Sequence, residues 1–190
     1  MGRLIKRLLP VPVLMFLKNL IHNMRYYMYD RKNVIQVKIT ELFPPEALHS
    51  LYAGGCITYQ YIEAYLGNDS ERYEWLRQLY SRAQHKDALI HNPVRFNALI
   101  ESFQKKGFNK RYPIWINSDN EFVSGGHRLA LCLYFRADPW VKVVDRPARA
   151  QINDEDFFEV MGFGNDVKEL VYLTRGILVD KFQNSMSNTE

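Results

Sequence analysis

The chain has 190 residues, of which 47% are hydrophobic and 24% are charged. This composition indicates a folded protein and excludes a disordered chain, and the length suits one domain with its own core. The formal net charge of +4 is concentrated at one end, because residues 1–32 hold seven basic residues and one acid, whereas residues 33–190 hold 18 basic and 20 acidic residues. A body with a charge of −2 lacks the broad positive surface of a duplex-DNA-binding protein, so duplex DNA is not an expected partner.

Residues 1–32 form a basic N-terminal arm that is predicted to be an amphipathic helix from Pro12 onward. Its apolar stretch is interrupted by charges and prolines and is shorter than the roughly 20 apolar residues that a membrane span needs. Two interpretations are open. The helix packs on the domain or against a second copy of itself in a homodimer, or residues 3–28 lie on an anionic membrane surface.

The two cysteines, Cys56 and Cys132, have no metal-ligand spacing and suggest no disulfide framework. Cys132 stands in an apolar run, where cysteine acts as a small buried hydrophobic residue. Such cysteine usage fits a reducing compartment. We therefore expect a cytoplasmic protein, peripheral on the inner face of the membrane if the arm binds lipid, and we predict no metal-ligating residue.

Residues 33–190 are predicted to form a single domain of strands and helices. Extended, apolar-rich segments predict strands at 34–39, 111–117, 121–123 and 140–144, with a turn at 118–120. The strand at 140–144 is expected to be buried on both faces. Helical patterns predict helices at 95–106, 129–135, 154–159 and 166–182.

Residues 47–91 are predicted to be a helical insertion rich in tyrosine. Gly54-Gly55 and Gly67-Asn68-Asp69 are expected to break it, and Asp69 or Ser70 can cap a helix at 71–82. Two roles are open for the aromatic side chains. They line a core, or they form a platform on which sugar rings or bases stack.

The most informative segment is the turn Ser124-Gly125-Gly126-His127-Arg128, which joins a predicted strand to a predicted buried helix. Glycines let the backbone approach a ligand closely, and a helix N-terminus favours phosphate. The histidine and the arginine add donors for an anion. These five residues are therefore the predicted phosphate-binding site, and the alternative is a purely structural connection with Arg128 as an ion-pair partner.

This segment resembles the ParB/sulfiredoxin superfamily, whose core motif is a strand, a Gly-x-x-Arg or Gly-x-His-Arg turn and a buried helix. Residues 34–46 are similar to the first strand of that family and its proline-containing exit, and residues 92–145 are similar to the rest of its core. The resemblance implies an α/β fold in which helices surround a small mixed sheet, with residues 47–91 as an insertion.

Two branches of the superfamily do not fit. Sulfiredoxins carry Gly-Gly-Cys-His-Arg with a nucleophilic cysteine, and Gly126 stands at that position here. Partition proteins bind CTP through a Gly-x-x-Arg box, matched by Gly125 and Arg128, but they need a helix-turn-helix and a dimerisation region afterwards. Only 45 residues follow Asp145, without a basic recognition helix. We therefore expect neither a sulfiredoxin nor a partition protein.

The third branch contains free serine kinases that use ATP or ADP. The resemblance implies that an acidic residue beyond the first strand acts as general base, which points to Glu46, with Glu41 as the second choice, and that His127 is catalytic. Glu46 could equally interact with the dipole of a helix that begins after Pro44-Pro45. The chain departs from those kinases at Ser124, where they have aspartate, and at Gly126, where they have histidine.

Three functions follow as hypotheses. The first is a nucleotide-dependent phosphotransferase that acts on a hydroxyl of a small molecule or saccharide, with ATP or ADP, or CTP as in the partition branch, and with Mg²⁺ accompanying the nucleotide. The second is a catalytically inactive nucleotide-binding module that regulates a partner. The third is a membrane-surface adaptor.

Overall fold

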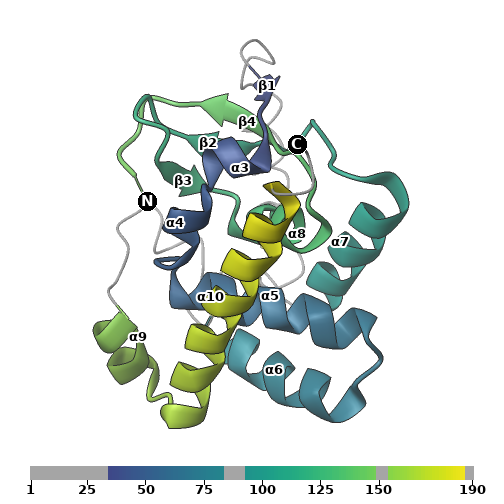
Figure 1. The fold of residues 1–190 in the computed structure, drawn as a ribbon. Helices are drawn as coiled ribbons and strands as arrows, with labels where there is room; N and C mark the ends of the chain where they lie inside the picture. The colour runs from purple at the N-terminus through teal and green to yellow at the C-terminus, as the bar shows by residue number, and fades with distance from the viewer. Residues whose placement is uncertain (1–33, 84–92, 149–153, 187–190) are drawn as a thin grey trace, which may run out of the picture. The chain divides into compact units, whose positions relative to one another are not determined.

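The computed structural model describes residues 34–83, 93–148 and 154–186, shown as ribbon in Figure 1. The predicted N-terminal arm lies outside the described residues, as does the end of the predicted insertion at 84–91. The chain from Val34 onward forms one compact unit. Among the described helices, none combines the length and the apolar character needed to cross a membrane.

Four short strands form one mixed sheet in the order β1-β4-β2-β3. The pairs β1–β4 and β2–β3 are antiparallel, and β2–β4 is parallel. The strands are β1 Val34–Gln36, β2 Ile114–Ile116, β3 Phe122–Ser124 and β4 Trp140–Val143. The expected mixed α/β fold is confirmed.

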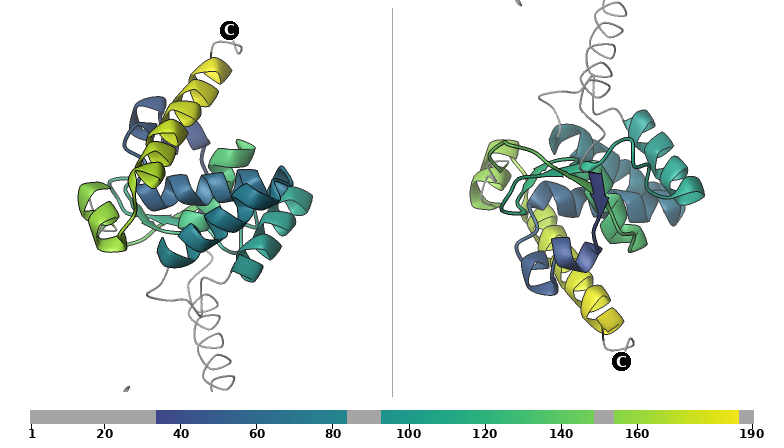
Figure 2. Two further views of the ribbon diagram at one scale, coloured as in Figure 1. Left: turned by 90° about the horizontal axis from the view of Figure 1, so that it is seen from below. Right: turned by 90° about the horizontal axis from the view of Figure 1, so that it is seen from above.

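The described residues also form eight helices (Figure 1). The helix α5 lies among α6, α8 and α10, and α8 also contacts α7 and β2, as can be followed in Figure 2. The helices are α3 Ile39–Leu42, α4 Pro45–Leu48, α5 Ala53–Leu66, α6 Ser70–Ala83, α7 Pro93–Lys106, α8 Gly126–Phe135, α9 Asp154–Met161 and α10 Asn165–Met186.

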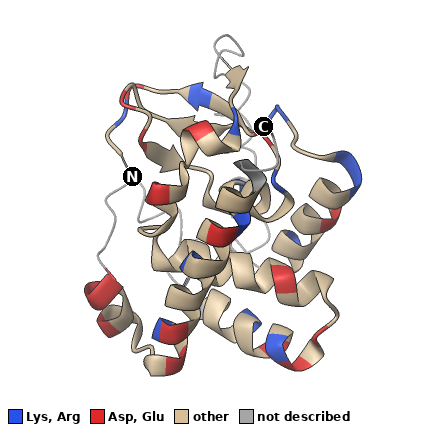
Figure 3. Cartoon of the chain, viewed as in Figure 1, with Lys and Arg blue, Asp and Glu red and all other residues tan. Residues whose placement is uncertain are grey.

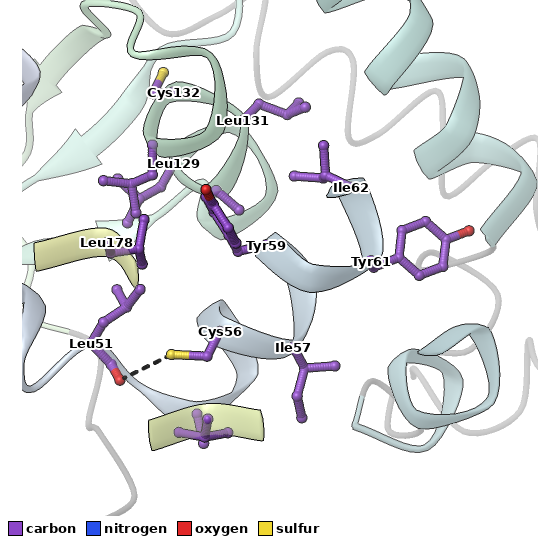
Figure 4. Close-up of a cluster of buried hydrophobic side chains, with 14 of the residues drawn as sticks. Leu51, Cys56, Ile57, Tyr59, Tyr61, Ile62, Leu129, Leu131, Cys132 and Leu178 are labelled. Carbon is purple, nitrogen blue, oxygen red and sulfur yellow. Dashed lines mark hydrogen bonds between the residues drawn. The ribbon is translucent and has the colours of Figure 1, made fainter. Parts of the chain in front are cut away.

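The core is centred on α5 and α8, whose buried side chains face one another in Figure 4. Leu129 and Leu131 of α8 are buried, as is Leu178 of α10, and burial of such apolar surface is the main stabilising term in folding. Cys132 is buried as expected. The Cys56 thiol is also buried and donates a hydrogen bond to the Leu51 carbonyl oxygen at 3.7 Å.

The structure corrects two expectations in the first half of the domain. Gly54-Gly55 does not break the insertion but lies in the first turn of α5, because the Tyr52 ring packs directly on both glycines. The first strand ends at Gln36 instead of Ile39, because the Asp138 carboxylate accepts the Ile39 N–H at 3.0 Å and holds the first turn of α3.

The break at Gly67–Asp69 is confirmed, and Asp69 is the cap, since its carboxylate accepts the N–H of Arg72 at 3.0 Å in the first turn of α6. The strand β4 is not buried along its whole length. Val141 is buried, whereas Val143 on the same face is 45% exposed.

Candidate functional site at the N-terminus of α8

A tight hairpin positions the turn that precedes α8. The Asn117 side-chain oxygen accepts the N–H groups of Asp119 and Glu121 at 3.0 and 2.8 Å, and Asn120 has a positive φ of 62°. Asparagine suits both positions, because its side chain can accept hydrogen bonds from nearby backbone N–H groups and its backbone tolerates the left-handed region. The hairpin returns β3 beside β2, so that β3 leads straight into Gly125.

Gly125 makes the sharp change of direction between β3 and α8. Its φ is 110°, a conformation that glycine adopts without strain. A Cβ atom here would lie 3.2 Å from the Cα of Ile114 on β2, so the turn approaches the sheet closely. The Leu129 N–H donates to the Gly125 carbonyl at 3.0 Å, which closes the first helical turn. The N–H groups of residues 126–128 therefore belong to the first turn, where helix geometry provides no acceptor within the helix.

Gly126 faces a residue that the sequence did not single out. A Cβ atom at this position would lie 2.5 Å from the Tyr52 hydroxyl oxygen and 3.9 Å from Cζ of Phe122. The Tyr52 and Phe122 rings are nearly parallel, with centroids 6.4 Å apart. Tyr52 therefore brings a hydroxyl group to the mouth of the turn. The sequence does contain a signal for this contact, because an aromatic residue stands two positions before the glycine pair Gly54-Gly55. A break in the helix was predicted at this glycine pair instead of a packing site for the aromatic ring.

His127 is held by the helical insertion. Its Nε2 atom lies 2.6 Å from the Tyr80 hydroxyl oxygen, and its ring packs at 4.9 Å from the ring of Phe96. Which of the two atoms donates depends on the tautomer of the imidazole. Burial raises the pKa of Tyr80, so its hydroxyl stays protonated at neutral pH. The insertion therefore fixes the orientation of His127 through α6.

The Arg128 guanidinium lies beside the turn and is half-buried. One terminal nitrogen donates to the carbonyl oxygen of Tyr112, in the segment that enters β2. The other would lie 3.6 Å from a Cβ atom at Gly125. Ser124, the last residue of β3, is exposed and pairs with Trp115. The five predicted site residues thus stand together, with Tyr52 and Tyr80 added to them.

The predicted general base is not joined to this turn. Glu46 is exposed in the first turn of α4, which packs against α10, and it forms no hydrogen bond or ion pair with any described residue. Its place in the first turn suits the dipole interpretation. Glu41, on α3, is also exposed.

Two roles were open for the tyrosines of α5 and α6, namely a core or a stacking platform. In the structure they pack in the core. Tyr59, Tyr61 and Tyr80 are buried. The Tyr61 hydroxyl donates to the side chain of Asn97 on α7 at 2.7 Å, which links α5 to α7.

The distribution of charged residues over the described part of the chain does not indicate a further ligand-binding surface. In Figure 3 lysines and arginines are interspersed with acidic residues over the drawn helices and strands. Within residues 34–83, 93–148 and 154–186, no group of three or more His, Cys, Asp and Glu side chains is arranged to hold a metal ion.

No family model, no curated protein and no solved structure matches the chain. A function for the chain is therefore inferred from the geometry of the turn itself.

Proposed function

We propose that the chain binds a nucleotide through its phosphate group at the turn Ser124–Arg128, within a fold of the ParB/sulfiredoxin type. The observation that carries the proposal is the convergence of a left-handed Gly125, a side-chain-free Gly126 and the Arg128 guanidinium at the first turn of α8. Backbone N–H groups, the helix dipole and a cationic fork all favour an anion at such a place.

Each residue has a definite task in this proposal. The N–H groups of the first turn and the Arg128 guanidinium bind phosphate oxygens, and the Tyr52 hydroxyl adds a donor next to Gly126. Ser124 supplies a hydroxyl at the exposed end of β3. His127 contributes a ring nitrogen whose position is set by the 2.6 Å contact with Tyr80.

The reaction that best uses this site is phosphoryl transfer from ATP or ADP to a hydroxyl of a small molecule or saccharide, with Mg²⁺ accompanying the nucleotide. Glu46 is the proposed general base. The segment that joins α4 to α5 supports it, since Tyr52 of this segment touches Gly126 and brings the stretch after Glu46 next to the turn. The Glu46 carboxylate is exposed and forms no hydrogen bond or ion pair with a described residue, so an acceptor hydroxyl can approach it.

A nucleotide-binding module without catalysis is the second candidate. It is supported by the absence of a hydrogen bond or ion pair between Glu46 and any described residue, and by Ser124 and Gly126, which replace the acid and the histidine of the kinases named above. The two candidates share the phosphate site and differ only in turnover.

A thermal-shift screen with ATP, ADP, CTP and GTP, each with and without Mg²⁺, tests the shared site. A ligand that binds only the folded chain must raise its melting temperature. Turnover with hydroxyl acceptors then separates the candidates, since Glu46→Gln should leave the shift unchanged and abolish transfer. If no nucleotide shifts the melting curve, both candidates fail. If the shift occurs without turnover in the wild type, only the binding module remains.

A further inference from the structure

The outward face of α10 carries large apolar side chains in contact with solvent. Tyr172 is 57% exposed and Leu173 is 60% exposed, whereas Val171, Leu178 and Phe182 on the other side of the same helix are buried in the core. Contiguous exposed apolar surface is one sign of an interaction site, whereas a single exposed apolar residue is common. The helix is the long yellow ribbon of Figure 1.

Gly176 lies at the midpoint of this 22-residue helix and is exposed. A Cβ atom added there would meet no atom of a described residue within 4 Å, so the described part of the fold gives no reason for a glycine. Glycine is markedly less favourable than alanine inside a helix. The reason we infer is external, namely that another helix backbone comes close at this point.

The residues around Gly176 form one continuous face, which we call the α10 face. Its members follow one another at steps of three or four along the helix, so they stand on the same side. They are Glu169, Tyr172, Leu173, Gly176, Asp180 and Gln183, and all are exposed.

We propose that a second copy of the chain docks on the α10 face, with the two helices antiparallel and crossing at Gly176. A parallel arrangement would oppose Glu169 to Glu169 and Asp180 to Asp180, which is repulsive. The antiparallel crossing instead opposes Asp180 to the Tyr172 hydroxyl and Glu169 to the Gln183 amide. Each carboxylate then meets a hydrogen-bond donor, as an isologous two-fold interface requires.

The length of α10 suits this pairing. Because Gly176 is central, an antiparallel pair overlaps along the whole helix, which is about 33 Å long for 22 residues. Leu173 lies within one turn of the crossing point on each helix, and Gly176 lets the two backbones approach. An anionic membrane is a poor occupant, since the face carries two carboxylates and no exposed lysine or arginine among its six members.

Sedimentation velocity on the full chain, over a range of concentrations, tests the dimer. Leu173→Glu should weaken association at least about tenfold, the change expected when an apolar contact at an interface centre is replaced by a charge. Val160→Glu is the matched control, because Val160 is 64% exposed on α9 and lies outside the α10 face. A wild-type chain that stays monomeric at every concentration, or association that survives Leu173→Glu, overturns the proposal.

Two further experiments make the test specific. Gly176→Ala should raise the melting temperature of the dilute chain, since alanine favours a helix and the added methyl group meets no described residue, and yet it should weaken association. An equimolar mixture of Glu169→Cys and Gln183→Cys chains should form a disulfide between copies, whereas each variant alone should not. The native cysteines are buried and would not interfere. Crosslinking of Glu169→Cys alone would show a parallel pair and overturn the stated geometry.

Discussion

The hydroxyl oxygen of Tyr52 lies 2.5 Å from the point where a Cβ atom on Gly126 would stand. The Tyr52 ring is itself seated on α5, since a Cβ atom at Gly55 would come within 3.0 Å of it. Gly54 and Gly55 of α5 and Gly126 of α8 therefore leave room for the side chain of Tyr52. This packing is a reason for glycine at position 126, whether or not a ligand binds there. Nothing larger than hydrogen fits at position 126 unless Tyr52 moves.

This contact predicts a non-additive pair of substitutions. Gly126→Ala should lower the free energy of unfolding by about 1–3 kcal/mol, as overpacking commonly does. Tyr52→Phe removes the obstructing oxygen and leaves the nearest ring atom, Cζ, at 3.7 Å, an ordinary contact. The double variant should be more stable than the sum of the single effects indicates, by about 0.5–3 kcal/mol, measured by urea denaturation. Strictly additive effects would show that Tyr52 does not restrict position 126.

The helix that carries the proposed site should depend strongly on its buried face. Leu131 is fully buried in α8 among the side chains of Figure 4, so Leu131→Ala should cost about 2–5 kcal/mol of unfolding free energy. Val160→Ala, at a position that is 64% exposed, is the matched control and should change stability by less than about 0.5 kcal/mol. Equal effects at the two positions would mean that α8 does not pack as described.

Stability should fall in alkali. Burial raises the pKa of Tyr59 from 10.0 to about 12 and that of the Cys56 thiol from 9.0 to about 12. The folded state therefore holds these protons more tightly than the unfolded state, and its advantage is complete below pH 9 and is lost as the pH rises towards 12. Urea denaturation at pH 8, 9, 10 and 11 should give a decreasing unfolding free energy. A constant value across this range would contradict the buried, neutral state of both groups.

Much of the local structure could be predicted from the sequence, because local chemistry determines it. The turn at Asn117–Glu121 depends on asparagine, the start of α6 on Asp69, and the entry into α8 on Gly125, and all three signals lie within a few residues of the feature that they produce. The turn residues 124–128 were identified for the same reason.

The surroundings of the site could not be predicted in this way. His127 is bound by Tyr80, which is 47 residues away along the chain, and Gly126 is covered by Tyr52, which directly precedes α5. Such contacts depend on how α5 and α6 pack against α8. The spacing of apolar residues in the sequence predicts which face of a helix is buried, but it does not predict which other helix packs against that face.

The measurement that tests the central claim most directly is calorimetric titration of the full chain with nucleotide. Arg128→Ala should weaken nucleotide binding by about 10-fold to 100-fold, because a charge-assisted bond contributes about 1.5–3 kcal/mol. Lys105→Ala, which removes one positive charge at the exposed end of α7, should leave the affinity unchanged. Since Arg128 also binds the Tyr112 carbonyl, the melting temperature of each variant without ligand is recorded alongside. Equal affinity in wild type and Arg128→Ala, or no binding of any nucleotide to the folded wild type, would contradict a phosphate site at the start of α8.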